Sequence, residues 1–298
     1  MTLRAKKPDV IQKRFKALFY GEAGSGKTTA AIQFPKSYLI DTERGAEHKQ
    51  YTDILSKNGG VIFQTSDFDE VYKEVKELLT TKHDYKTLII DPITIVYDNL
   101  IDLSIKEIIS RSKDPSVDGT EYGRHISFAD RKIKPLLNML LRLDMNIILT
   151  AHAKNEYIGG KSTNQQTFDA CKKLSYLFDV NLEIQKRNKK RIAIIKKSRI
   201  KEFEDMDTFE FSYTSIAEKF GVDIIEKECE KEILATSEQV DKIKNLISLL
   251  KVEEETIEKW LSKANASTLE EMETSKIQAC IDYLTEKFTG NKKTGETK

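Results

Sequence analysis

The sequence has few of the residues that build disulfide-bonded, membrane-spanning or metal-cluster proteins. Only three of its 298 residues are cysteines, and no two of them show the short spacing of a zinc site or a redox pair. No apolar run approaches the roughly 20 residues that span a bilayer. The charges of 48 acidic and 49 basic side chains nearly cancel, so the net charge of the protein does not attract nucleic acid. These absences predict a soluble protein of the cytoplasm with reduced thiols, which recognises partners through local patches.

Short apolar runs recur along the first two thirds of the chain, and several are separated by segments with helical periodicity. This βαβα rhythm predicts an α/β fold with a buried, mostly parallel central sheet. The predicted helices cover 68–80, 93–109 and 128–143, and the predicted strands cover 17–20, 37–41, 61–65, 87–91 and 146–150. Two more strands within 179–197, joined by the turn RNKK, predict an antiparallel hairpin at the edge of the sheet.

A different composition begins near Ile233. Three amphipathic segments, at 235–251, 253–264 and 274–288, predict a small helical module, with Ser237 and Thr274 at helix caps. Residues 233–290 hold 11 acidic and 7 basic side chains, so the module is acidic. The predicted organisation is a large α/β core over 12–228, a helical module over 233–290 and a disordered tail over 291–298.

The segment GEAGSGKT, Gly21 to Thr28, has the spacing G-x-x-x-x-G-K-[ST] between a predicted strand and a predicted helix. Such a loop turns its backbone N–H groups toward a polyphosphate, Lys27 reaches the β and γ phosphates, and Thr28 ligates Mg²⁺. A glycine-rich turn without a ligand is the alternative, and the strand-to-helix context argues against it. The residues predicted to bind ATP are Gly21, Glu22, Ala23, Gly24, Ser25, Gly26, Lys27, Thr28 and Thr29.

Two predicted strands end in acids, which hydrolysis of a triphosphate requires. TLIIDP ends at Asp91, the layout of a Walker B aspartate that holds Mg²⁺ through water. SYLIDTE ends at Asp41 and, two residues on, Glu43, which can orient or deprotonate the attacking water. Each acid is alternatively a turn or helix-cap residue.

In the order of these parts the sequence resembles the RecA-type recombinase ATPases, in particular the smaller phage-encoded RecA-like nucleotide-binding proteins that serve single-strand annealing. The resemblance covers about residues 15–212. DTE, Asp41 to Glu43, matches the family's acid-x-Glu, whose Glu is catalytic, so the resemblance favours Glu43 over Asp41 as the base. It implies a Mg²⁺-dependent ATPase that assembles into a ring or filament on single-stranded DNA, in the host cytoplasm if the protein is phage-encoded.

The family's next strand ends in a polar residue that senses the γ phosphate, and a mobile DNA-binding loop follows. NIILTAHAKNEYIGGKSTNQQTF is similar, with His152 at the sensor position and residues 154–167 as the loop. Bacterial RecA carries an amide at the sensor, and this chain departs from it with a histidine. Apart from the resemblance, a histidine at a strand end is more often a structural hydrogen-bond partner.

The edge hairpin is also similar to the family. RIAIIKKSRI places Lys196 and Arg199 where the family presents cations to ATP on the neighbouring subunit. The lysine matches closely, and the second cation is displaced by one residue. Both residues are therefore expected to act in trans during catalysis, and the alternative for both is a solvated charge that protects the sheet edge.

Local basic patches are candidates for single-stranded DNA. Within 154–167, Lys154, Tyr157 and Lys161 combine charge, a stacking surface and flexible glycines. The polar loop 111–125 adds Arg111, Lys113, Tyr122 and Arg124. Residues 186–201 carry nine Lys or Arg and no acid, which fits phosphate binding and a solvated edge equally well. Neither loop has a base-reading pattern, so binding is expected to be salt-dependent with little sequence preference.

Two rival functions remain open from the sequence. A P-loop kinase for a small molecule usually has an Arg-rich lid and a closed acceptor pocket, whereas here the basic residues lie on a hairpin and open loops. A helicase loader or another ATP-switched interaction protein is the other rival, because the acidic module at 233–290 is suited to a partner such as a single-strand-binding or replication protein. Measuring ATP hydrolysis with and without single-stranded DNA distinguishes the recombinase from the kinase and from the loader.

Overall fold

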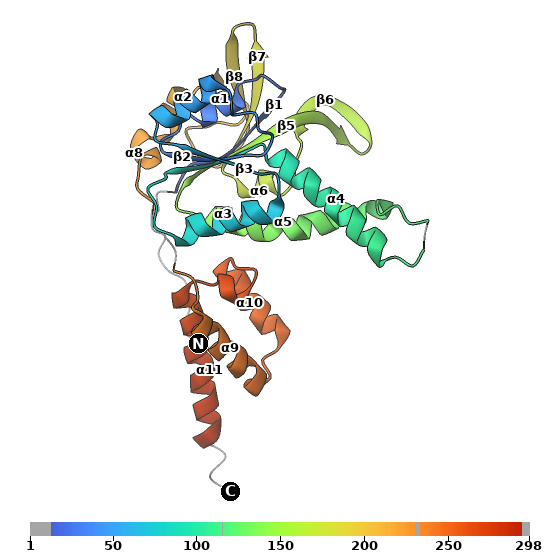
Figure 1. The fold of residues 1–298 in the computed structure, drawn as a ribbon, viewed down its shortest axis with the longest axis vertical. Coiled ribbons are helices and arrows are strands. Elements are labelled where there is room, and N and C mark those ends of the chain that lie inside the picture. Colours follow the sequence, from blue (N-terminus) through green and yellow to red (C-terminus); the bar gives the residue numbers. More distant parts are fainter. Residues whose placement is uncertain (1–12, 115, 230–232, 294–298) are drawn as a thin grey trace. The chain divides into compact units, whose positions relative to one another are not determined.

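A computed structural model describes residues 13–114, 116–229 and 233–293 of the chain (Figure 1). Its contacts divide these residues into two compact units. The first unit contains the described residues up to 67, then 84–99 and 145–229; the second contains 68–83, the described part of 100–144 and the described residues from 233 onward. No helix in the described ranges is both long and apolar enough to cross a membrane.

The first unit is built on a nine-stranded sheet with the order β3-β2-β4-β5-β1-β7-β8-β9, and β6 pairs with the far end of β5. All neighbours from β3 to β7 run parallel, and β6, β8 and β9 are antiparallel to their partners. The strands are β1 (Lys16–Gly21), β2 (Ser37–Asp41), β3 (Val61–Gln64), β4 (Thr87–Asp91), β5 (Asn146–Ile158), β6 (Lys161–Phe168), β7 (Val180–Arg187), β8 (Lys190–Ser198) and β9 (Thr208–Glu210). The predicted α/β fold with a mostly parallel sheet and a hairpin near its edge is confirmed.

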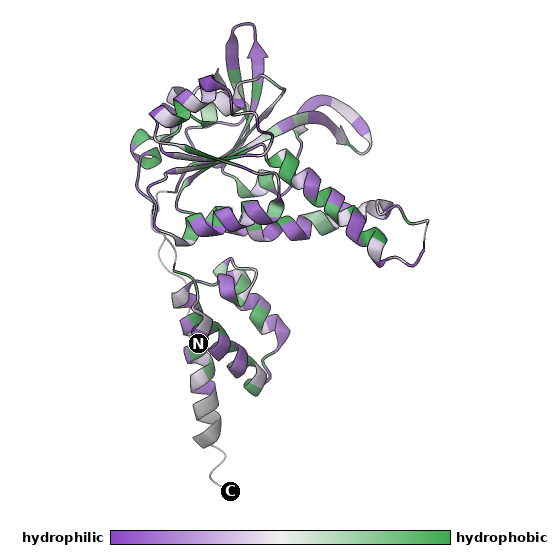
Figure 2. Cartoon of the chain, in the orientation of Figure 1, coloured by the Kyte–Doolittle hydropathy of each residue, from purple (hydrophilic) through white to green (hydrophobic). Residues whose placement is uncertain are grey.

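The apolar strand sequences explain which strands lie inside. Strands β1 and β4 are buried along their whole length, as expected of parallel strands covered on both faces. Hydropathy follows the same division, because the central strands are hydrophobic while the ends of β7 and β8 are hydrophilic (Figure 2). The short edge strand β9 was missed by the sequence analysis, because three residues are too few to show a periodicity.

The helices of the first unit leave the sheet at the strand ends. They are α1 (Lys27–Ala31), α2 (Lys49–Lys57), the first turns of α4 (Ile93–Arg111), α6 (Leu174–Leu177), α7 (Tyr213–Phe220) and α8 (Val222–Ile225). Aromatic rings fill the core beside α1, where Phe15 stacks on Phe34 with ring centroids 6.0 Å apart and Phe19 meets Phe211 edge-on at 5.2 Å. This packing fixes α1, and with it the loop between β1 and α1.

The segment 154–167 is a β-ribbon, so the prediction of an irregular loop there is wrong. Strand β5 continues eight residues beyond the predicted end at 150, and β6 returns along it after a turn at Gly159 and Gly160 (Figure 1). The inner half of β5 is apolar and buried, whereas the outer half is polar and mostly exposed. Polar residues hid this extension, because sequence periodicity detects a strand through its buried face.

The second unit is helical. It contains α3 (Phe68–Thr80), the remainder of α4, η1 (Glu121–Gly123), α5 (Arg124–Arg142), α9 (Ser237–Leu250), α10 (Glu254–Ala264), η2 (Leu269–Glu271) and α11 (Thr274–Lys293). Its C-terminal helices have a core of their own, formed by Val240, Ile243, Ile277, Ile281 and Leu284 among others.

Helix ends in the second unit correct two sequence predictions. Thr236 caps α9 through a capping box with Gln239, so the predicted cap Ser237 is one residue too late. Thr274 is the first residue of α11, and its hydroxyl donates to the carbonyl of Leu234 at 2.5 Å. Residues 294–298 of the predicted tail lie outside the described residues, and the boundary predicted near residue 230 stays a prediction.

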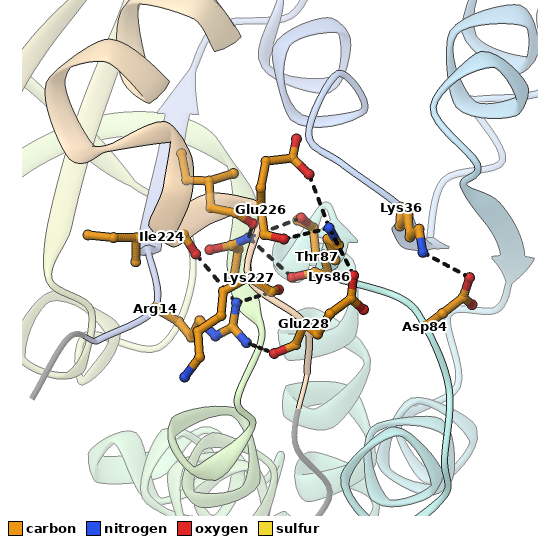
Figure 3. Close-up of polar contacts among 11 residues, drawn as sticks. Arg14, Lys36, Asp84, Lys86, Thr87, Ile224, Glu226, Lys227 and Glu228 are labelled. Atoms are coloured by element: carbon orange, nitrogen blue, oxygen red, sulfur yellow. Dashed lines mark hydrogen bonds and ion pairs between the residues drawn. The ribbon is translucent and has the colours of Figure 1, made fainter.

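A polar network ties the segment 224–228 to the start of the sheet (Figure 3). Arg14 donates to the carbonyl oxygens of Lys227, at 2.8 Å, and of Glu228. Lys86 pairs with the carboxylates of Glu226 and Glu228, each at 3.2 Å. The segment that ends the first unit is therefore held by Lys86, just before β4, and by Arg14, before β1.

Asn146, the first residue of β5, completes this network from inside the protein. Its Oδ1 accepts from the N–H of Phe15 at 3.3 Å, and its Nδ2 donates to the carbonyls of Ile225 at 2.8 Å and Lys86 at 3.2 Å. Its side chain is fully buried. One amide thus satisfies backbone groups from three separate segments.

We expect Asn146→Ala to destabilise the first unit by at least about 2 kcal/mol, because each buried polar group left without a partner costs about 1–3 kcal/mol. A urea titration followed by circular dichroism measures the shift. Asn155→Ala, at an exposed position of the same strand, is the matched control and is expected to change stability by less than about 0.5 kcal/mol. Equal midpoints for the two variants would show that the network is dispensable.

Candidate nucleotide-binding site

The loop from Gly21 to Thr28 connects β1 to α1, as the sequence predicted. Gly21 lies where β1 approaches β7 so closely that a Cβ on it would sit 2.3 Å from the carbonyl oxygen of Ile184. Gly26 has φ of +92°, a conformation that favours glycine. The two glycines therefore fix the path of a loop whose backbone amides can surround an anion.

Lys27 points back into this loop. Its Nζ donates to the carbonyls of Gly21 at 2.8 Å and Glu22 at 3.0 Å, and to Ser25 Oγ at 3.3 Å. Burial lowers the pKa of Lys27, and the nearby carboxylates of Asp91 and Glu43 oppose that shift. The ammonium group is held by weak neutral acceptors in the space enclosed by the loop, so a bound phosphate would offer it a stronger, charged partner.

Asp91 ends β4 beside the start of α1, and it is 9% exposed. The hydroxyl of Thr150 on β5 donates to its carboxylate, and Thr28 is also hydrogen-bonded to it. Burial raises the pKa of Asp91 and the charge of Asp41 adds to the effect, while the two threonines and Lys27 oppose it. A carboxylate in contact with a threonine hydroxyl supplies the oxygen donors that Mg²⁺ prefers, so Asp91 and Thr28 fit the predicted metal role.

The two acids after β2 have different surroundings. Asp41 is 2% exposed, and its carboxylate accepts from the backbone N–H groups of Glu43, Gly45 and Ala46 at 3.0–3.3 Å. Its oxygens are therefore occupied in shaping the turn that follows β2. The side chain of Glu43 is 43% exposed, and its Oε1 lies 2.8 Å from His152 Nε2. This geometry favours Glu43, rather than Asp41, as the group that meets water.

His152 lies on β5 directly opposite Gly21 of β1. Its backbone N–H donates to Thr94 Oγ1 at 3.0 Å, and Thr94 in turn donates to the carbonyl of Asp169, the residue after β6. The ring pairs with Glu43. The candidate sensor and the candidate base are thus in direct contact, which neither the sequence spacing nor the resemblance specified.

The two cations expected to act in trans are engaged within their own chain. Lys196 Nζ lies 3.5 Å from Glu183 Oε2 and 3.4 Å from Gln165 Oε1. Arg199, just past the end of β8, donates to the carbonyl of Tyr176. Either residue would have to leave these partners to reach a nucleotide on another subunit.

The candidate DNA-binding residues fall in two places. On the ribbon, Lys154 pairs with Asp169 at 2.7 Å, Tyr157 is 62% exposed, and Lys161 begins β6 after the glycine turn. The others belong to the second unit, at and after the end of α4: Arg111, which pairs with Glu107, and Lys113, Tyr122 and Arg124. The ribbon belongs to the same unit as the nucleotide-binding loop, and its strand β5 also carries His152.

Sequence reasoning missed two groups of residues beside the loop. Thr94 and Thr150 follow apolar runs and carry no motif, so nothing in the sequence marked them. Lys189 and Arg191 were counted only as part of a basic run, yet they line a cavity of about 450 Å³ together with Gly26 and Thr28. Only the folded hairpin brings them to the nucleotide loop.

Comparison with known proteins identifies a family for most of the chain. The family model described as AAA domain matches residues 13–220. Among solved structures, the crystal structure of the RadB recombinase is similar at 19% identity and a TM-score of 0.42, with 66% of this chain and 86% of that chain covered. No curated protein matches the sequence.

We expect Lys27→Ala to weaken triphosphate binding, and Glu43→Gln to keep binding while lowering hydrolysis about 100-fold or more, because only Glu43 acts on the water. Calorimetric titration and phosphate release measure the two effects separately. Glu47→Gln, in the same turn but bonded to Gln64, is the matched control and should hydrolyse ATP like the parent. Parental turnover by Glu43→Gln would move the base elsewhere.

Proposed function

The chain belongs to the AAA domain family, and from this premise we propose that it is a Mg²⁺-dependent ATPase that binds single-stranded DNA as a recombinase or annealing protein. ATP turnover is coupled to the assembly of several copies on the DNA. The phage-encoded annealing proteins that the sequence resembles supply the finer part of this proposal. The P-loop, Asp91 and Glu43 support the ATPase part.

The contacts of each residue support the chemistry that we propose for it. Lys27 and the loop amides bind the phosphates, and Thr28 and Asp91 hold Mg²⁺, which neutralises charge on the phosphate oxygens when it is bound. Glu43 orients the attacking water and accepts its proton. His152 Nε2 lies 2.8 Å from Glu43 Oε1, so a movement of one side chain changes the position or hydrogen bonding of the other.

One observation carries the coupling of ATP to DNA: the candidate residues for both lie on the single strand β5. Thr150 bonds Asp91, His152 bonds Glu43, and two residues later Lys154 begins the exposed ribbon. A strand is a stiff element, so a shift at its nucleotide end moves its outer end as well.

The ribbon has the surface expected for single strands. Tyr157 and Ile158 are 62% and 67% exposed beside a glycine turn, and Lys154 and Lys161 flank them. An exposed aromatic ring stacks on any base, and lysines contact the phosphates. The proposed binding is therefore tolerant of sequence and sensitive to salt.

Assembly supplies the remaining part of the site. Lys196 or Arg199 from a neighbouring copy stabilises charge on the transferring phosphoryl group once it leaves Glu183 or the carbonyl of Tyr176. Hydrolysis per subunit then rises with protein concentration. The acidic helices after residue 233 serve as the contact for a single-strand-binding or replication protein.

ATP hydrolysis measured with and without single-stranded DNA tests the proposal. We expect DNA to stimulate turnover, and we expect Tyr157→Ala to weaken DNA binding about 5-fold or more, since stacking contributes about 1–3 kcal/mol per base. Tyr176→Ala, at an exposed tyrosine outside the ribbon, is the control and should bind DNA like the parent.

Two other outcomes favour a rival, and a third removes one part of the proposal. ATP turnover that DNA does not change, and that transfers phosphate to a small acceptor, favours a kinase. Slow turnover that requires a protein partner favours a loader. Specific activity that stays flat across the concentrations of assembly removes the role of Lys196 and Arg199 in trans.

A further inference from the structure

A cavity of about 450 Å³ opens beside the P-loop, on the side of α1. Its walls come from the loop itself, from α1 and α2, from the turn of the β7–β8 hairpin and from the residues between β9 and α7. Its volume is within the range of pockets that bury small ligands. The cavity is therefore large enough to hold part of a nucleotide.

The charge of the cavity is one-sided. Three cations line it, Lys27, Lys189 and Arg191, and the described residues of its wall include no carboxylate. Tyr51 and Phe211 add aromatic surface. A lining of cations and aromatic rings suits a ligand that is both anionic and planar.

The cavity is separate from the residues proposed for hydrolysis. Thr28 borders both places, because it lines the cavity and is hydrogen-bonded to Asp91. Glu43, His152 and Asp91 do not line the cavity. If the γ phosphate lies at these residues, the rest of the nucleotide extends past Thr28 into the cavity.

Arg191 is the side chain that lies nearest to the position of a Cβ on Gly26. Its Nε, Cγ and Cδ lie 3.5–3.7 Å from the position that a Cβ of Gly26 would occupy. Arg191 belongs to β8, where successive side chains point to opposite faces. Lys190 accordingly does not line the cavity, although it lies between two residues that do.

We propose that this cavity binds the nucleoside end of the nucleotide, and that Arg191 and Lys189 contact the phosphate nearest the sugar within the same subunit. The proposal rests on nucleotide binding by the P-loop, and it gives these two cations of the basic hairpin a role in cis. They are then neither DNA contacts nor groups presented to a neighbour.

Calorimetric titration of the full chain with ADP and with the non-hydrolysable analogue AMP-PNP, both without DNA, tests the proposal. Arg191→Ala should weaken both ligands by the same factor of about 10 or more, because both carry the phosphate nearest the sugar and a charge-assisted bond is lost. Lys189→Ala, at an exposed position, should weaken both by up to about fivefold. Arg191→Lys keeps the charge without the planar fork and should recover part of the loss.

Lys190→Ala is the matched control, since it removes the same charge from the same hairpin and should bind both nucleotides like the parent. Thermal unfolding followed by circular dichroism checks that each variant is folded. If Arg191→Ala does not fold, the losses in Lys189→Ala and Arg191→Lys carry the test.

Distinct results would overturn the proposal. If Arg191→Ala binds both nucleotides as tightly as the parent, Arg191 does not contact the phosphate. If Lys190→Ala loses as much affinity as Arg191→Ala, the loss is a general effect of charge. A loss for AMP-PNP alone that grows with protein concentration would place Arg191 in trans. If Lys27→Ala loses nucleotide binding and Arg191→Ala keeps it, the role of Arg191 is excluded and nucleotide binding by the P-loop stands. If Lys27→Ala binds nucleotide like the parent, nucleotide binding by the P-loop is itself excluded.

Discussion

The candidate site depends on the parallel pairing of β5 with β1 on one side and with β4 on the other. This register puts His152 opposite Gly21, and it brings Thr150 to the carboxylate of Asp91. Each of these residues comes from a strand whose apolar sequence places it in the interior of the sheet. The polar residues at the carboxyl ends of β1 and β4 therefore meet those of β5 on the same side of the sheet. A slip of β5 by one residue would reverse the facing of all its side chains and remove Thr150 from Asp91 and His152 from Glu43.

The electrostatics of the edge follow from this placement. Burial works against the charged form of both Lys27 and Asp91, and each group is partly stabilised by the other. Lys27 meanwhile uses carbonyl oxygens of its own loop as acceptors. Phosphate and Mg²⁺ would supply charged partners to both groups, which gives binding a physical source beyond the loop amides. Glu43 and His152 stand at the exposed side of the same edge, where water has access.

The sequence predicted the parts whose information is local. The P-loop motif, Asp91 at a strand end and the hairpin turn all follow from a few consecutive residues, and the strands at 37–41 and 87–91 have the predicted ends. The ribbon was missed because its residues are polar, and the contact between His152 and Glu43 was missed because it joins separate strands. Arg191 illustrates the same limit: a basic run looks alike whether it faces DNA, solvent or a nucleotide, and only the alternation along β8 separates Lys190 from its neighbours.

The central claim is that β5 transmits the state of the nucleotide to the ribbon that we propose binds DNA, and the affinity for single-stranded DNA in different nucleotide states tests it most directly. Fluorescence anisotropy of a labelled oligonucleotide, with AMP-PNP and with ADP, gives the coupling between the two ligands. The account predicts a difference of about 5-fold or more in the parent and its loss in His152→Ala, with affinity in ADP retained. Equal affinities in the parent, or a difference that survives in His152→Ala, would contradict it.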